Sequence, residues 1–243
     1  MTRKAGRVPE ETRARLLEAA TEEFCQVGFQ KTSLRTICAH AGVTTGAVYF
    51  FFEGKDDLLV HIIDPVCKEF LEFIDKHYGA HAKENHAGLY ATKDEDIAMA
   101  HELIEIIKAH RPAVTVLLQN QEHEAVVAFL DKAVDQLIAY LIGLEETISR
   151  YYPNARGAGG ETTTVWLAHV ITDSFLEAVS ASFRSKSYYS ELDADDQEKD
   201  LLDLMPDMII GELRISIQMV LRYRMFNSGQ TDVPKEVLPL PAD

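Results

Sequence analysis

The stretch from Thr32 to Leu58 constrains the fold more than any other part of the sequence. It reads as two short helices joined by a glycine turn and followed by the start of a third helix. Ser33 is placed to cap the first helix, since its hydroxyl can accept a hydrogen bond from an amide of the opening turn. Gly42 stands where that helix must end, because glycine adopts a left-handed backbone at little steric cost. With Thr44 expected to cap the second helix, the pattern predicts a helix-turn-helix, a motif that places its second helix in the major groove of DNA.

Apolar residues at helical spacing extend this motif on both sides. The preceding helix has Leu17, Ala20, Phe24 and Val27 on one face, and a fourth helix is expected from Lys55. A proline at position 65 predicts a kink or a break in that helix. Helical spacing continues as far as a last helix over about 197–226, without strand-like alternation. We predict an all-α protein of about nine helices, with an N-terminal three-helix helix-turn-helix domain (1–54) and a larger C-terminal helical bundle domain (55–243).

The formal net charge of −15 is unevenly distributed along the chain. Residues 1–60 hold eight basic and eight acidic side chains, whereas residues 61–243 hold the remaining 16 basic and 31 acidic ones. Residues 1–15 alone contain five Arg or Lys and two Glu. Because an acidic body repels phosphate, DNA contact should be confined to the N-terminal end. The alternative interpretation of the basic residues at the start is a solvated tail.

Several patterns argue against other classes of protein. No apolar run reaches the roughly 18–20 residues of a membrane span, and the polar start MTRKAGRVPEETR carries no secretory signal. We therefore expect a cytoplasmic protein with no membrane partner. Neither a nucleophile motif nor a phosphate-binding loop is present, so we expect no enzyme, no catalytic residue and no cofactor.

The cysteines and loop histidines do not form a recognisable metal module. Three single cysteines without CxxC spacing favour buried reduced thiols over a redox or metal role; they are Cys25, Cys38 and Cys67. Three histidines near Glu84 lack the spacing of a known zinc module; they are His77, His81 and His86. Solvated histidines are the better interpretation, and we expect no metal site.

Residues from about 10 to 60 resemble the tetracycline-repressor (TetR) family in continuous register. The resemblance is carried by Gly28-Phe29, Thr32-Ser33-Leu34-Arg35, Ile37, Ala41-Gly42-Val43, Gly46-Ala47-Val48-Tyr49, Phe52 and Lys55. It implies a homodimeric repressor whose N-terminal domain binds double-stranded palindromic operator DNA. It also implies that the C-terminal helices form the dimer and bind a small-molecule effector, which releases the operator.

Candidate DNA contacts follow from this resemblance and from side-chain chemistry: Ser33, Arg35, Thr44, Thr45, Gly46, Ala47, Tyr49, Phe50 and Lys55. Threonine hydroxyls can bond bases or phosphates. Tyr49 and Lys55 stand where the family places a phosphate-contacting tyrosine and a backbone-contacting lysine. Arg35 could reach a phosphate or a groove edge, or could be solvated beside a glutamate.

Three positions depart from the family pattern. Phe51 stands where the family commonly has His or Tyr, and Phe50 also lacks a hydrogen-bond donor. Contact with sugar or a thymine methyl is what remains for them, or core packing for Phe51. Gly54 replaces the usual polar cap of the fourth helix, which costs only about a few tenths of a kcal/mol relative to serine.

The effector side of the chain is less informative. An expected helix over about 161–183 has an apolar face (Val165, Ala168, Thr172, Phe175, Val179, Phe183) and a second face with Trp166, His169, Asp173 and Glu177. Trp166, His169 and Asp173 are candidate ligand-binding residues, giving an aromatic wall and polar anchors. The alternative is a polar patch at the dimer interface. Two other functions stay open: a helical ligand-binding or enzymatic domain with a purely structural N-terminal motif, and a regulator that responds to a protein partner.

Overall fold

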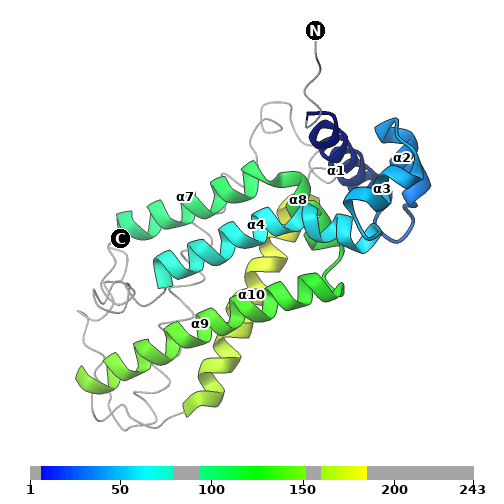
Figure 1. Ribbon diagram of the computed structural model, residues 1–243. Coiled ribbons are helices and arrows are strands. Elements are labelled where there is room, and N and C mark those ends of the chain that lie inside the picture. The colour runs from blue at the N-terminus through cyan, green and yellow to red at the C-terminus, as the bar shows by residue number, and fades with distance from the viewer. Residues whose placement is uncertain (1–6, 79–92, 152–159, 185–243) are drawn as a thin grey trace. The chain divides into compact units, whose positions relative to one another are not determined.

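The computed structural model describes residues 7–78, 93–151 and 160–184, and within these ranges all regular structure is helical (Figure 1). The helices are α1 (Arg7–Val27), α2 (Leu34–Ala41), α3 (Thr45–Phe51), α4 (Lys55–Tyr78), α7 (Lys93–Ala109), α8 (Arg111–Gln119), α9 (Glu124–Tyr151) and α10 (Gly160–Arg184). The all-α prediction is confirmed. The last helix, expected over 197–226, lies outside the described residues. No helix in the described ranges is both long and apolar enough to cross a bilayer.

The chain forms two compact units, each built from two separate stretches of sequence. Unit 1 comprises Met1–Glu69 and Ala109–Phe129, and unit 2 comprises Phe70–Lys108 and Leu130–Asp243. Unit 1 therefore contains the predicted helix-turn-helix, the first part of α4 and the whole of α8. The functional division of the chain at residue 54 stays a prediction.

The core of unit 1 forms where α1 packs against α2 and α8, and α2 packs against α3. Its fully buried side chains include Leu16, Phe24, Ile37 and Val48. The predicted inward face of α1 is partly wrong, because Val27 is 46% exposed. Val27 is the last residue of α1, where the chain turns at Gly28 with a φ of 89°.

Helix α4 runs without interruption from Lys55 to Tyr78, with Pro65 inside it. The predicted break is therefore wrong, whereas a kink stays a prediction. A proline removes one backbone hydrogen bond from a helix, and buried side chains on both sides of it, including Ile62 and Val66, hold this helix in the core. Cys67 is also buried; burial and the nearby charge of Asp64 raise the pKa of its thiol to about 12.

Unit 2 has its own core of aromatic and aliphatic side chains. Val134, Tyr140, Leu141 and Ala168 form one buried cluster, and the ring of Tyr78 lies 4.9 Å from that of Tyr140. At the surface of the same unit, the Nζ of Lys76 donates to both carboxylate oxygens of Glu102 at 2.6 and 2.8 Å. His77 lies 3.0 Å from the same carboxylate. Hydrogen bonding from Lys76, followed by that from His77, lowers the pKa of Glu102.

Candidate nucleic-acid interface

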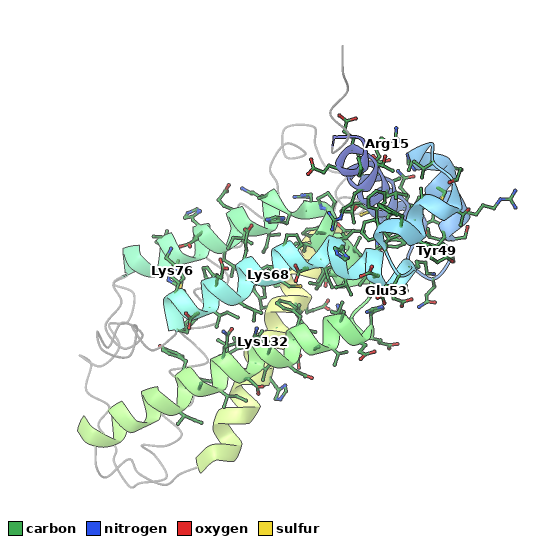
Figure 2. All side chains as sticks on the ribbon, viewed as in Figure 1. Arg15, Tyr49, Glu53, Lys68, Lys76 and Lys132 are labelled. Carbon is green, nitrogen blue, oxygen red and sulfur yellow. The ribbon has the colours of Figure 1, made fainter. Side chains whose placement is uncertain are left out.

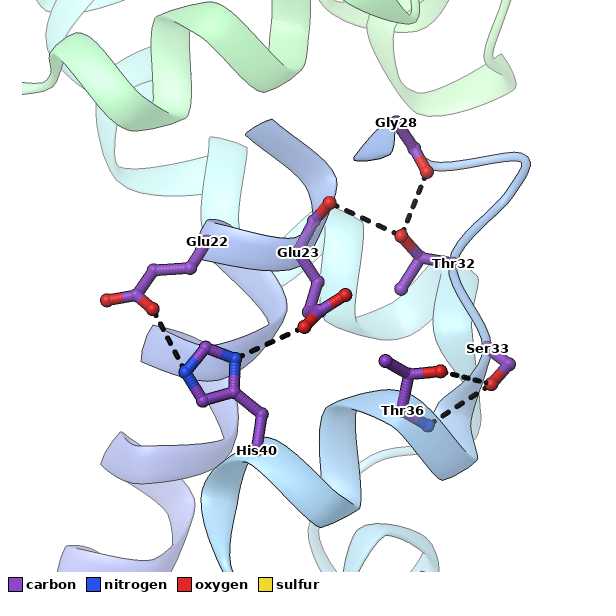
Figure 3. A network of polar contacts seen from close by, with 7 residues as sticks. All are labelled: Glu22, Glu23, Gly28, Thr32, Ser33, Thr36 and His40. Atoms are coloured by element: carbon purple, nitrogen blue, oxygen red, sulfur yellow. Dashed lines mark hydrogen bonds and ion pairs between the residues drawn. The ribbon is translucent and has the colours of Figure 1, made fainter. Parts of the chain in front are cut away.

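The turn between α2 and α3 has the geometry that the sequence predicts. Ser33 Oγ accepts a hydrogen bond from the amide of Thr36 at 3.1 Å, which confirms the predicted cap of α2 (Figure 3). Gly42 ends α2 with a φ of 64°, in the left-handed region. The following amide, of Val43, donates back to the carbonyl of Cys38 at 2.9 Å. Satisfying these terminal backbone groups fixes the direction in which α3 leaves α2.

Helix α3 turns one side into the core and the other to solvent. Val48 is fully buried, whereas Tyr49 is 63% exposed and Phe50 is 77% exposed; Figure 2 labels Tyr49 on this helix. Thr44, Thr45 and Gly46 are exposed as well, and Ala47 is half-buried. The structure therefore brings most of the predicted α3 contacts onto one accessible surface. That these residues bind DNA stays a prediction.

Thr44 occupies the N-cap position of α3, but its side chain makes no capping hydrogen bond. This part of the prediction is wrong for a local reason. The amide of Ala47, which the hydroxyl would have capped, donates instead to the backbone carbonyl of Thr44 at 2.9 Å. The hydroxyl of Thr44 is therefore not used in capping and is exposed beside Thr45.

The three consecutive phenylalanines at the end of α3 differ in burial. Phe52 is 3% exposed, Phe51 is half-buried and Phe50 is largely exposed. Their rings are in contact: 4.8 Å separates the centroids of Phe50 and Phe51, and 6.4 Å separates those of Phe51 and Phe52. Arg13 holds the innermost ring from the other side, with its guanidinium carbon 5.3 Å from the centroid of Phe52. Of the two uses considered for Phe51, this geometry favours packing.

Lys55 is engaged within unit 1. Its Nζ donates to the carbonyl of Phe29 at 2.8 Å and to the carbonyl of Thr32 at 3.2 Å. The same ammonium lies 4.3 Å from the centroid of the Phe29 ring, in a cation–π contact. An ammonium has only three donors, so two of them already join the start of α4 to the loop between α1 and α2. Its phosphate contact stays a prediction, and this structural role was missed from the sequence.

The start of α4 compensates for the glycine at its cap. The carboxylate of Asp57 accepts a hydrogen bond from the amide of Glu53 at 2.9 Å. An acidic side chain in the first helical turn that reaches back in this way replaces half of a capping box. Gly54 therefore leaves the helix start satisfied through Asp57.

Two polar contacts that the sequence did not indicate join α2 and its preceding loop to α1 (Figure 3). His40 lies 3.1 Å from the carboxylate of Glu22 and 3.3 Å from that of Glu23. The buried hydroxyl of Thr32 donates to the carbonyl of Gly28 at 2.9 Å. These pairs are far apart in sequence and have no periodic signature. On α2 itself, Arg35 is exposed in the first turn.

Helix α8 completes unit 1 around the same region. The thiol of Cys25 lies 3.5 Å from the carbonyl of Pro112, and burial raises the pKa of that thiol. His123 Nε2 lies 3.2 Å from the carboxylate of Asp56, and its ring meets the edge of the Phe29 ring at 5.4 Å. Residues beyond position 110 therefore hold both α1 and the start of α4.

On α10 the predicted division into two faces agrees with burial. Ala168 and Val179 are buried, whereas His169 and Asp173 are exposed. The side chain of Trp166 lies outside the described residues, so the ligand-binding set stays a prediction. His77 is paired with Glu102, and the other two loop histidines, 81 and 86, also lie outside. Among the described residues no cluster of potential ligands could hold a metal ion.

Comparison with known proteins places this geometry in a family. Residues 16–62 match the family described as "Bacterial regulatory proteins, tetR family". The transcriptional regulator SrpR of Pseudomonas putida is 43% identical over 63 residues, which are 26% of this chain and 30% of SrpR. The transcriptional repressor BepR of Brucella suis biovar 1 (strain 1330) is 27% identical over 173 residues, 70% of this chain and 77% of BepR. The match thus spans less than a third of SrpR, and it falls on the helix-turn-helix.

Solved structures extend the likeness to the whole fold. A transcriptional regulator of the TerR/AcrR family from Aquifex aeolicus VF5 has a TM-score of 0.52 at 18% identity, covering 84% of this chain and 98% of that one. The SmeT–triclosan complex has a TM-score of 0.52 at 22% identity, covering 83% of this chain and 90% of that one. At these identities the likeness shows the fold alone.

Proposed function

This chain belongs to the TetR family of bacterial regulatory proteins, and we propose that it is a DNA-binding transcriptional repressor that leaves a palindromic operator when a small effector binds its C-terminal domain. The observation that carries the proposal is the exposed surface of α3. Thr45, Tyr49 and Phe50 project from a helix whose opposite side, at Val48, is fully buried. A recognition helix needs such a rigid attachment on one side and reading groups on the other.

The charge distribution supports the same assignment. The acidic excess lies entirely in residues 61–243, so the N-terminal part is the region that phosphate does not repel. Arg35 and Ser33 are exposed at the start of α2, where they can reach the DNA backbone while α3 reads the bases.

For the C-terminal part, we propose a homodimer formed through its helices. The exposed His169 and Asp173 of α10 are available for a partner subunit or for a ligand that also meets Trp166. Triclosan bound to SmeT is one example of a small molecule held by a protein of this fold. Helix α4 contributes residues to both units, so we propose that it relays the effect of ligand binding.

The direct test is a gel shift with DNA from upstream of the protein's own gene and with a shuffled sequence of equal length. We expect a salt-dependent complex with the upstream DNA at concentrations that leave the shuffled DNA free. Arg35→Ala should weaken binding and lower the slope of log K against log salt by about 1. The matched control is Lys132→Ala, which removes a positive charge from an exposed position on α9 of unit 2 (Figure 2). Equal affinity for both DNAs would overturn the proposal.

A further inference from the structure

We infer that Phe50 determines base specificity by contacting the C5-methyl group of thymine in the major groove. The inference rests on the proposed function and adds to it the chemical group that α3 reads. Phe50 is the most exposed of the large apolar side chains in the described residues, at 77%. An aromatic ring left in water at this level loses the burial that normally stabilises it. A partner surface that covers the ring restores that burial.

The position of the ring is set from within the protein. The ring of Phe50 meets that of Phe51 edge to face, with an interplanar angle of 86°. The ring of Phe51 contacts in turn the buried ring of Phe52, over which the guanidinium of Arg13 lies. This row of rings joins the exposed side chain to the core. Phe50 therefore approaches a partner with little conformational freedom to lose, which favours selective contact.

The chemistry of the groove selects the occupant. Phenylalanine has no donor or acceptor, so it cannot bond a phosphate or the polar edge of a base. In the major groove, the C5-methyl of thymine is the apolar group that base pairs display. Thr45, one turn earlier on α3, and Tyr49 supply the hydroxyls that polar base edges and phosphates require. The apolar ring beside them accordingly reads the methyl group.

The test removes only that methyl group. The full chain selects duplexes from a random-sequence library, and the tightest duplex is resynthesised with deoxyuridine in place of each thymine in turn. We expect one thymine per half-site at which deoxyuridine weakens binding about fourfold, the value of one buried methyl-sized group. Phe50→Ala should bind the thymine and deoxyuridine duplexes equally. Its melting temperature should match that of the native chain, because the side chain is exposed.

Tyr49→Phe is the matched control, because it alters the neighbouring exposed aromatic without removing its ring. It should bind both duplexes less tightly and keep the fourfold ratio. A ratio that survives in Phe50→Ala, or a deoxyuridine series with no effect at any position, overturns the inference while sequence-specific DNA binding stands. If no duplex is enriched at all, the proposed function fails and the inference fails with it.

Discussion

Replacing Lys55 with methionine should destabilise unit 1 and leave the salt dependence of DNA binding unchanged. The substitution keeps an apolar stem against the Phe29 ring but removes both hydrogen bonds to the carbonyls of Phe29 and Thr32. Hydrogen bonds from a charged donor contribute roughly 1.5–3 kcal/mol each, and the cation–π contact about 0.5–1 kcal/mol. Because Lys55 is only half-buried, water can replace part of this in the variant, and we expect a net loss of about 2 kcal/mol.

The assay must report on unit 1 alone. The single tryptophan, Trp166, lies in α10, so its fluorescence follows unit 2. Amide hydrogen exchange read by mass spectrometry in peptides from α1 and α2 is therefore the appropriate measurement. A loss of about 2 kcal/mol should accelerate exchange about 30-fold for amides that open with the whole unit.

Lys31→Met is the control for this experiment, since it removes the same charge from an exposed position of unit 1. Its exchange should match that of the native chain. The reasoning is refuted if Lys55→Met leaves exchange unchanged and lowers the slope of log K against log salt by about 1. That result would assign the ammonium to a DNA phosphate.

Three further predictions concern stability and reactivity. Gly42→Ala should lower the melting temperature by about 2–4 °C, because a Cβ meets nothing within 4 Å and only the left-handed backbone, at about 1 kcal/mol, is strained; an unchanged melting temperature would contradict this. Since the pKa of Glu102 is lowered in the folded state, its stabilising effect is present above the unfolded value of 4.5 and is lost as pH falls through the folded value. Glu102→Gln should therefore lower the melting temperature at pH 7 but not at pH 3, and a deficit that persists at low pH would argue against the pair with Lys76. Cys67, with a pKa of about 12, should resist thiol-specific labelling at pH 8 until guanidinium unfolds the chain; rapid labelling of the native protein would refute its burial.

The helix-turn-helix could be predicted because its signals are local. The Ser33 cap and the left-handed Gly42 depend on residues within one helical turn, and both are confirmed. The Thr44 cap failed within the same local range, because a backbone carbonyl competed for the amide that the hydroxyl would have bound. Composition could not decide between those two acceptors.

Contacts between distant parts of the sequence could not be predicted. The partners of Lys55 lie 26 and 23 positions away, and those of His40 lie on a different helix. Likewise, apolar spacing identified α8 as a helix but did not assign it to unit 1. Pro65 is a related case, since its effect on α4 depends on how tightly the surrounding core holds that helix.

The place of α8 in unit 1 has a consequence for protein synthesis. The partners of Cys25, Phe29 and Asp56 lie at Pro112 and His123, far downstream of the helix-turn-helix. At about 5–20 residues per second, a ribosome delivers Phe129 roughly 4–15 seconds after Gly54. During that interval the surface of α1 that α8 later covers is open to solvent on the nascent chain. Early aggregation of unfinished chains would therefore begin on that surface.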